Sequence, residues 1–388
     1  MTISLKNICS FQSGGTPSKQ NSDYFNGNIP WITTVALNGR IIDQNSAVDW
    51  ITEKAIQESA AKIVPAGSIM VGTRVGVGKV AINAVPMSTS QDIISLVGID
   101  GSKWNKEYLC KFLQSKESFL KSQSRGATIK GIKIDALAAL EVPGLPLSEQ
   151  EKIVSVLNHT LDIIEQRKAQ LAALDELVKA RFVEMFGDPE YNNKSWPIQT
   201  LDQLCSIGSS KRLYQNEQTS RGIPFWRISD LVSKMDNGFV NSNLFISEKK
   251  YGELKQSGLV PVANDILVTS RGTIGRCYII KEEDQFYFQD GMISWLSNYS
   301  EKITSLYLQY LFMMPDFRKQ INSMQAGSTV AYLSIAMLKK LKVMVPSKEL
   351  QSDFSNFVSQ VDKTKSAVQK YLEKSQLLFD SLMQEYFG

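Results

Sequence analysis

The chain has 388 residues, of which 43% are hydrophobic and 21% charged, and its formal net charge is +4. This length allows two domains of ordinary size, and this composition excludes disordered and collagen-like classes. No tract stays apolar over the roughly 18 residues that a membrane helix needs, and the first residues lack a secretory-signal pattern. The four cysteines form no CxxC pair, so we expect neither zinc nor disulfides and a reduced, cytoplasmic setting.

The charge is distributed unevenly along the chain. Residues 1–147 carry 15 Lys and Arg against 11 Asp and Glu, and residues 195–346 carry 17 against 13. The remaining segments together carry 11 against 15. A basic surplus of +4 therefore belongs to each of two globular segments, which is where contacts with an anionic partner such as DNA are expected.

The first globular segment, residues 1–147, predicts short strands separated by turns. It opens with a polar loop, "SGGTPS" (13–18), and continues to the apolar "IPWI" (29–32). Later β-branched runs such as "SIMVGTRV" (68–75) and "KVAI" (79–82) are separated by Gly, Pro and Asn, which is typical of strands and tight turns. We expect a mixed α and β domain, with more strand than helix.

The next segment, residues 148–194, begins with a long helix. From 148 to 186 it contains no Gly or Pro, and apolar residues recur every seven positions, which predicts a coiled-coil helix. Ser148 in "LSEQ" is the expected N-cap. The predicted seam positions are Leu157, Ile164, Leu171, Val178 and Met185.

The second half of the chain repeats the first in the same order. "LDQLCS" (201–206) matches "LKNICS" (5–10), "IPFWRI" (223–228) matches "IPWI", and "DILVTSRGTIGR" (265–276) matches "SIMVGTRVGVGK" (68–79). "GSTV" (327–330) likewise matches "GATI" (126–129). The offset drifts only from 194 to 201 between the matched anchors, so residues 195–346 predict a second, divergent copy of the first domain.

The last segment, residues 347–388, predicts a second coiled-coil helix. Apolar residues follow alternating spacings of four and three, and the predicted seam includes Phe354, Val361, Val368, Leu378 and Leu382. Neither long helix can bury its apolar stripe alone, so we expect the two to pack together as an antiparallel rod of roughly 60 Å. The predicted fold class is α+β, a pseudo-twofold tandem repeat of two mixed domains separated by coiled-coil helices.

Two cationic turns are the strongest candidates for binding residues. The first projects Arg74 and Lys79 around a glycine-bearing turn, and its repeat projects Arg271 and Arg276. Glycine permits close approach of the backbone to a phosphate, and an arginine can donate two hydrogen bonds to guanine. The alternative is an ordinary exposed hairpin with surface cations.

Two further pairs of residues remain open between a binding and a structural role. Trp31 and Trp226 can stack on bases, but their position in the "IPW" strands favours the core. The duplicated Gln-Asp pairs include Gln91 and Gln289, and glutamine can read adenine through two hydrogen bonds. A role at a turn or strand edge fits these glutamines equally well.

Catalytic motifs are not found in the sequence. "GTRVGVGK" (72–79) departs from a phosphate loop, because Thr73 stands where the first glycine belongs and Val80 replaces the hydroxyl residue. "DPEY" (188–191) resembles the box of amino-methyltransferases but follows a helix and lacks the second proline. The sole histidine, His159, is expected to be an ordinary helix residue, and we predict no catalytic or metal site.

The order of these motifs, repeated twice, resembles the specificity subunit of type I restriction-modification systems. The resemblance covers nearly the whole chain and implies target-recognition domains at 1–147 and 195–346, joined to spacer helices within 148–194 and 347–388. The second copy departs from the pattern, because "SSKRLYQ" (209–215) replaces the loop containing Thr16. The predicted DNA-contacting residues are Thr16, Lys19, Arg74, Lys79, Gln91, Lys130, Lys211, Arg212, Arg271, Arg276 and Gln289.

The same resemblance implies the partners and the division of chemistry. The chain is expected to be non-catalytic, to bind double-stranded DNA with an asymmetric, bipartite target, and to have no contact with a membrane. It implies two methyltransferase subunits that methylate adenine with S-adenosylmethionine, and restriction subunits that use ATP and Mg²⁺, with no cofactor in this chain. The alternative function is a coiled-coil scaffold that binds protein partners without reading DNA.

Overall fold

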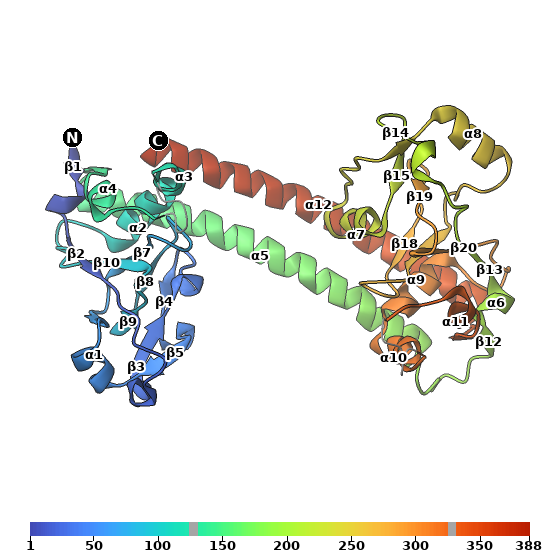
Figure 1. Cartoon of the computed structure of the whole chain (residues 1–388), viewed down its shortest axis with the longest axis horizontal. Coiled ribbons are helices and arrows are strands. Elements are labelled where there is room, and N and C mark those ends of the chain that lie inside the picture. Colours follow the sequence, from blue (N-terminus) through green and yellow to red (C-terminus); the bar gives the residue numbers. More distant parts are fainter. Residues whose placement is uncertain (124–130, 325–330) are drawn as a thin grey trace. The chain divides into compact units, whose positions relative to one another are not determined.

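The computed structural model describes residues 1–123, 131–324 and 331–388, and these form two compact units. Unit 1 contains residues 1–168 and 369–388, and unit 2 contains residues 169–368. The two longest helices, α5 (Leu147–Phe186) and α12 (Lys348–Phe387), each contribute one part to each unit. Figure 1 labels many of the helices and strands of both units.

Unit 1 is a mixed α and β unit, as the sequence predicts. Its strands are β1 (Thr2–Ser4), β2 (Ser10–Ser13), β3 (Phe25–Ile32), β4 (Ile41–Ile42), β5 (Asp49–Ile51), β6 (Ile63–Val64), β7 (Ile69–Gly72), β8 (Val80–Asn83), β9 (Met87–Thr89), β10 (Ile93–Val97) and β11 (Glu141–Pro143). Its shorter helices are η1 (Leu5–Asn7), η2 (Ser22–Tyr24), η3 (Thr34–Ala36), η4 (Gln44–Ser46), α1 (Glu53–Glu58), α2 (Lys106–Ser115), α3 (Glu117–Ser122) and α4 (Ile134–Ala138).

Two sheets carry the unit 1 fold. The main sheet has the strand order β2-β10-β7-β8-β4, and the smaller one has the order β5-β3-β9-β6. In the main sheet β2, β10, β7 and β8 are antiparallel neighbours, whereas β3 and β9 pair in parallel in the smaller sheet. The runs "IMVG" and "VAIN" form β7 and β8 and are buried throughout, which explains why they are continuously apolar rather than alternating.

Unit 2 repeats this plan, but the described part of residues 195–346 contains more helix than strand, which corrects the prediction of more strand than helix for the repeated domain. Its strands are β12 (Ile198–Thr200), β13 (Ser206–Gly208), β14 (Gln218–Thr219), β15 (Ile223–Trp226), β16 (Phe245–Ile246), β17 (Ile266–Thr269), β18 (Cys277–Ile279), β19 (Tyr287–Phe288), β20 (Ile293–Ser297) and β21 (Lys342–Met344). Its shorter helices are α6 (Leu201–Leu204), η5 (Gln215–Glu217), α7 (Ile228–Asn237), α8 (Glu248–Gln256), α9 (Ser305–Met313), α10 (Pro315–Ser323) and α11 (Ile335–Lys339).

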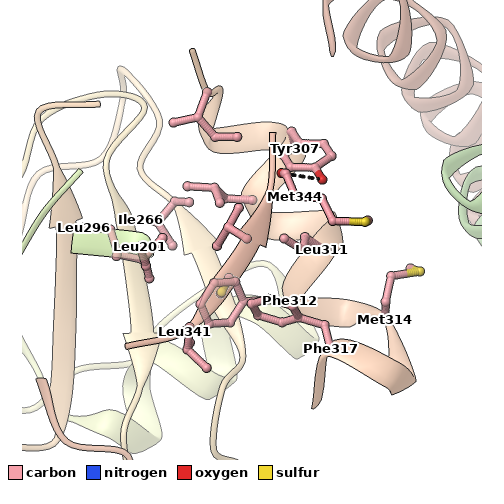
Figure 2. Packing of buried hydrophobic residues seen from close by; sticks show 14 of the residues in the cluster. Leu201, Ile266, Leu296, Tyr307, Leu311, Phe312, Met314, Phe317, Leu341 and Met344 are labelled. Atoms are coloured by element: carbon pink, nitrogen blue, oxygen red, sulfur yellow. Dashed lines mark hydrogen bonds between the residues drawn. The ribbon is translucent and has the colours of Figure 1, made fainter. Parts of the chain in front are cut away.

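The strand order of unit 2 confirms the predicted repeat. Its main sheet, β13-β20-β17-β18, corresponds to β2-β10-β7-β8, and its smaller sheet, β14-β16-β15-β19, again contains a parallel pair, β15 with β19. The core beside the main sheet is apolar (Figure 2), and the hydroxyl of Tyr307 on α9 donates a hydrogen bond of 3.0 Å to the carbonyl of Met344. Tyr108 on α2 makes the equivalent bond to Pro143 at 3.1 Å.

The two long helices pack together within each unit. In unit 1, Leu157 near the start of α5 shares a buried cluster with Phe387 at the end of α12. In unit 2, Phe186 at the end of α5 packs against Phe354 near the start of α12, with ring centroids 5.4 Å apart. The start of one helix therefore lies beside the end of the other in each unit, so the helices run antiparallel.

The predicted seam residues differ in how deeply they are buried. Six are buried: Leu157, Ile164, Val178, Phe354, Val361 and Val368. Leu171, Met185 and Leu382 are partly buried. Leu378 departs from the prediction because 53% of its surface is exposed, and the neighbouring Phe379 packs on the core instead. A helix of 3.6 residues per turn drifts from a strict 4-3 stripe, which shifts the buried face by one residue near this end.

The predicted N-cap at Ser148 is also corrected. Helix α5 begins at Leu147, and the carbonyl of Pro146 already accepts a hydrogen bond of 3.1 Å from the Gln150 amide, so Ser148 lies inside the first turn. In the second copy the hydroxyl of Ser347 does accept from the amide of Leu350, at 3.3 Å. His159 is an exposed residue of α5, in agreement with its interpretation as an ordinary helix residue.

Candidate nucleic-acid interface

Three segments of unit 1 meet at one end of its main sheet. Strand β2 ends at Ser13, which pairs with Ile94 of β10, and β7 ends at Gly72, which pairs with Ile93. The loop after β2, the turn after β7 and the connection into β10 therefore emerge together. We name residues 14–21, 73–79 and 90–92 the unit 1 polar edge.

Unit 2 has the same arrangement. Gly208 at the end of β13 pairs with Trp295 of β20, and Thr269 at the end of β17 pairs with Ile293 at the start of β20. Residues 209–214, 270–276 and 289–292 form the unit 2 polar edge. The two edges contain all the predicted DNA-contacting residues except Lys130, which lies outside the described residues.

The cationic turn of unit 1 is closed by backbone hydrogen bonds. The amide of Gly72 donates to the carbonyl of Lys79 at 2.8 Å, and the amide of Gly78 donates to the carbonyl of Gly72 at 2.9 Å. Gly78 has a φ of 82°, a left-handed conformation that disfavours a side chain. A tight turn that ends on Gly78 and Lys79 is what the sequence predicts.

The turn of unit 2 reproduces these bonds. Thr269 donates to Arg276 at 2.9 Å, Gly275 donates to Thr269 at 2.8 Å, and Gly275 has a φ of 75°. Each turn is also joined to the strand beside it, because Ser270 donates to Met292 at 2.9 Å, as Thr73 donates to Asp92 at 2.8 Å in unit 1. The backbone of the two turns is thus the same frame with different side chains.

The opening loops of the two edges use different groups to reach the same partners. In unit 1 the amides of Gly14 and Gly15 donate to the carbonyls of Ile93 and Thr89 at 3.0 and 2.9 Å. A Cβ on Gly15 would lie only 2.1 Å from the Ala60 carbonyl oxygen, so the backbones approach too closely for a side chain.

Serine hydroxyls take over these two bonds in unit 2. Ser209 Oγ donates to the carbonyl of Ile293 at 3.0 Å, and Ser210 Oγ donates to that of Phe288 at 2.7 Å. This substitution explains how "SSKR" replaces "GGTP" without changing the frame. The residue after the second serine, Lys211, is exposed and stands at the place of Thr16.

The duplicated Gln-Asp pairs are not structurally equivalent. In unit 1 the backbone amide of Ser90 donates to the carbonyl of Ile32 at 2.9 Å. In unit 2 the equivalent bond, to the carbonyl of Trp226, comes from the backbone amide of Gln289. The connection into β20 is one residue longer than the connection into β10, so Gln289 corresponds to Ser90, and Asp290 and Gly291 together occupy the place of Gln91. The sequence match is therefore misaligned by one residue at this point.

The predicted residues of the unit 1 polar edge face solvent. Thr16, Lys19, Arg74, Lys79 and Gln91 are all exposed. The structure brings Thr16 and Gln91 together, because the hydroxyl oxygen of Thr16 accepts a hydrogen bond of 3.4 Å from the backbone N–H of Gln91. No hydrogen bond or ion pair joins the side chain of Arg74 or Lys79 to another described residue, so both cations are available to an anionic ligand.

Two of the arginines of the unit 2 polar edge, Arg212 and Arg276, are held by acidic partners that sequence reasoning did not identify. Arg212 Nε lies 2.7 Å from Asp290 Oδ2, and Arg276 Nη2 lies 2.6 Å from Asp236 Oδ1 on α7. The Asp290 carboxylate raises the pKa of the Arg212 guanidinium, and the Arg276 hydrogen bond lowers the pKa of Asp236 below its usual range. Both pairs fix the direction of an arginine near the surface.

The two tryptophans belong to the core. Trp31 is 7% exposed and donates its indole N–H to the carbonyl of Gly15 at 3.1 Å, which secures the opening loop from beneath. Trp226 is 6% exposed and stacks on Phe286 with ring centroids 3.6 Å apart. By strand pairing, Trp31 corresponds to Phe225 and not to Trp226. Trp31 of β3 pairs with Ser88 of β9, and Phe225 of β15 pairs with Tyr287 of β19, the equivalent parallel strand.

The described residues contain no arrangement suited to metal binding or to thiol chemistry. No group of three or more His, Cys, Asp or Glu among them could hold a metal ion. Burial raises the pKa of Cys9, Cys110 and Cys205 to about 12 and also raises that of Cys277, so these thiols stay protonated at neutral pH. In the same parts of the chain, no helix combines the length and apolar character needed to span a bilayer.

Comparison with known proteins gives a consistent result. The family model described as "Type I restriction modification DNA specificity domain" matches residues 1–173 and again 193–377. The type I restriction enzyme MjaIX specificity subunit of Methanocaldococcus jannaschii is 28% identical over 91% of this chain and 84% of its own length. The EcoR124I/EcoR124II specificity subunit of Escherichia coli is 29% identical over 40% of this chain and 39% of its own length.

Solved structures support the same fold. The S subunit of a type I restriction-modification system from M. genitalium matches with a TM-score of 0.54 and 17% identity, covering 100% of this chain and 96% of its own. A chain from a structure on complex assembly and conformational transition of the type I R-M system matches with a TM-score of 0.64 and 16% identity, covering 100% and 97%. The chain therefore belongs to the family of type I restriction-modification DNA specificity subunits, whose members direct target recognition and leave catalysis to partner subunits.

Proposed function

We propose that the two polar edges are the DNA-reading surfaces of this chain and that each reads one half of a split target. The observation that carries this proposal is the repetition of one hydrogen-bonded frame with different exposed side chains. A shared frame allows both units to meet DNA in the same manner, whereas different side chains allow them to read different bases. The target is then bipartite and asymmetric.

The side chains on the edges suit a duplex with a phosphate backbone. Arg74 and Lys79 supply cations in unit 1, and Arg212, Arg271 and Arg276 supply them in unit 2. Neutralising phosphates releases counterions, so cations at an edge raise the affinity for any DNA, and those that reach base edges add sequence preference. In unit 1, Thr16 and Gln91 add neutral donors and acceptors beside the cations.

The family places methyl transfer and cleavage in other subunits, and this defines the proposed partners. We assign residues 1–147 and 195–346 to the two recognition domains, and the helical segments within 148–194 and 347–388 to spacing and docking. Two methyltransferase subunits would bring S-adenosylmethionine for adenine methylation, and restriction subunits would bring the ATP- and Mg²⁺-dependent activity. We place this assembly in the cytoplasm, with double-stranded DNA as its target.

The long helices are proposed to set the gap between the two half-sites. Forty residues of helix extend about 60 Å at 1.5 Å per residue. One turn of DNA spans about 34 to 36 Å, so helices of this length match the scale of two half-sites separated by an unread spacer. The apolar seam in each unit holds the two helices against each other there.

Alanine substitutions at each edge test the assignment in the complex with the methyltransferase partners. Arg74→Ala with Lys79→Ala should weaken DNA binding and reduce the steepness of its salt dependence by about one unit for each phosphate that is no longer neutralised. Arg212→Ala with Arg271→Ala should affect only the other half-site. Lys103→Ala and Lys302→Ala are the matched controls, because these exposed lysines follow β10 and β20 at the opposite end of each sheet.

The outcomes separate DNA reading from the scaffold alternative. Loss of affinity or of preference confined to the expected half-site, with unchanged controls, supports the proposed edges. Equal effects of edge and control variants would show that DNA is read elsewhere on the units. Assembly with methyltransferase subunits but no DNA binding by the wild-type complex would favour a scaffold without DNA readout.

A further inference from the structure

The arginines at the same position of the two turns have different neighbours. In unit 2 the guanidinium carbon of Arg271 lies 5.1 Å from the ring centroid of Tyr332, within the range of a cation–π contact. In unit 1 the corresponding arginine, Arg74, adjoins Gly131, which has no side chain. A Cβ added to Gly131 would lie 3.2 Å from Arg74 Cγ, which shows how close the two segments are.

Backbone hydrogen bonds establish this correspondence in register. Leu333 donates its amide to the carbonyl of Ser270 at 2.9 Å, and Ile132 donates to Thr73 at 2.8 Å in unit 1. In unit 2, Tyr332 precedes the donor and Arg271 follows the acceptor. In unit 1, Gly131 precedes the donor and Arg74 follows the acceptor. Leu333 is fully buried, so the core anchors the segment that presents the tyrosine.

We propose that Arg271 and Tyr332 form a pre-stacked pair that reads guanine in the half-site of unit 2, with Tyr332 as the positioning residue. This inference rests on the proposed DNA-reading role of the unit 2 polar edge. A guanidinium that lies on an aromatic face keeps its N–H groups free at its edges, where they can donate together to guanine O6 and N7. Arg271 is exposed, so these donors reach solvent in the absence of DNA.

Stacking matters because a free arginine side chain loses much rotational freedom when it binds. Tyr332 restricts Arg271 before binding, which lowers the entropic cost of a two-bond contact and favours one orientation of the fork. Arg74 has no such support from Gly131. The same turn therefore presents an oriented guanidinium in unit 2 and, among the described residues, one without an aromatic neighbour in unit 1. This difference gives the half-sites different readout from the same backbone.

The test uses the complete complex of this chain with its methyltransferase partners and a DNA library randomised over both half-sites. Arg271→Ala should reduce the preference for guanine at one position of the unit 2 half-site by roughly 5- to 150-fold, the range expected when a bidentate hydrogen-bonded pair with a base is removed. Tyr332→Leu should reduce preference at that same position by a smaller factor. Tyr332→Phe keeps the ring and should retain the wild-type preference.

Lys302→Ala is the matched control, because this exposed lysine lies at the opposite end of the unit 2 main sheet, and it should leave the preference in the unit 2 half-site unchanged. Arg271 is exposed, so Arg271→Ala should not disturb folding. This variant therefore still tests the pair if Tyr332→Leu affects folding. The pair is overturned if Arg271→Ala lowers affinity equally for all sequences, as a phosphate contact would, or if Tyr332→Leu leaves the preference intact. A wild-type complex with no sequence preference would instead overturn the proposed DNA-reading function itself.

Discussion

Gln351 joins α12 to the start of α9 through the backbone of Thr304. Its side-chain oxygen accepts the Thr304 amide at 2.9 Å, and its nitrogen donates to the carbonyls of Lys302 and Pro346 at 2.8 and 3.0 Å. The side chain of Gln351 is fully buried. Such a residue fixes the angle at which a long helix leaves its domain, because the amide can satisfy all three groups in only one position.

Unit 1 contains the same clamp. Gln150 is fully buried, accepts the amide of Asn105 at 2.8 Å and donates to the carbonyls of Lys103 and Leu145 at 3.0 and 2.9 Å. Both long helices are therefore attached to their units by the same three-bond contact. The proposed spacing between half-sites depends on this attachment of each helix to its own unit.

Gln351→Ala is expected to destabilise unit 2 by about 2 to 5 kcal/mol, because the buried bond to the Pro346 carbonyl and the part-buried bonds to the Thr304 amide and the Lys302 carbonyl are all lost. Hydrogen exchange should show faster exchange of the Thr304 amide, and urea unfolding should show a lower midpoint. Gln369→Ala, an exposed position on the same helix, is the control and should change stability by less than about 0.5 kcal/mol. Unchanged protection of Thr304 would contradict the clamp.

Asp236→Asn is expected to tighten DNA binding by the complex. The substitution removes a negative charge and releases Arg276, and one more phosphate contact should steepen the salt dependence by about one unit. Asp202→Asn, at the opposite end of the main sheet, should have no such effect. Because Arg276 lowers the pKa of Asp236, mild acidification to about pH 6 should not reproduce the gain. Unchanged or weaker binding would show that Arg276 has a purely structural role.

Asp265 should make unit 2 less stable at neutral pH than at lower pH. Burial raises the pKa of this carboxyl above its usual value, although Val262 and Trp295 donate hydrogen bonds to it at 2.9 and 2.8 Å. The Asp265 carboxyl therefore loses its proton at a lower pH in the unfolded state than in the folded state. Its contribution to the free energy of unfolding is full below the unfolded-state pKa and falls as the pH rises through the folded-state pKa.

The consequence is measurable with Asp265→Asn. The substitution should raise the urea midpoint of unit 2 at pH 7, and the gain should shrink as the pH is lowered through the folded pKa of the wild-type carboxyl. Glu301→Gln, at an exposed position, should show no comparable dependence. A lower midpoint for Asp265→Asn at pH 7 would mean that the two charge-assisted hydrogen bonds outweigh the cost of burial.

A heptad inserted into both α5 and α12 should lengthen the unread part of the target. Seven residues add about 10.5 Å of helix, which corresponds to about three base pairs at 3.4 Å each. Both half-sites should keep their sequences because the polar edges are untouched. Methylation mapping of the variant gives the spacer directly. A gap of unchanged length would refute the idea that the helices determine it.

The repeat and the long helices could be predicted from the sequence because they depend on local patterns. An apolar stripe over forty residues without Gly or Pro leaves few alternatives to a coiled-coil helix, and matched anchors in one order require two related units. The helix ends were less accessible. Whether Ser148 or the carbonyl of Pro146 completes the first turn depends on hydrogen bonds that no spacing reveals, and the exposure of Leu378 depends on gradual helix drift.

The candidate edges could be predicted only in part. Arg74 and Arg271 stood out because a cation precedes a glycine turn in both copies, and that turn has the same geometry in both units. The match of Gln91 with Gln289 was wrong, since Gln289 corresponds to Ser90 and a one-residue insertion follows it. Tyr332 and Asp236 could not be identified, because they reach their arginines from segments about 60 and 40 residues away in the sequence.

Mapping methylated adenines in the native genome with and without this gene tests the central claim most directly. If the chain addresses methyltransferases through two different edges, one asymmetric motif of two parts separated by a gap of fixed length loses methylation when the gene is deleted. If every methylated motif persists although the methyltransferase partners are expressed, the chain does not direct methylation and the DNA-reading account is contradicted.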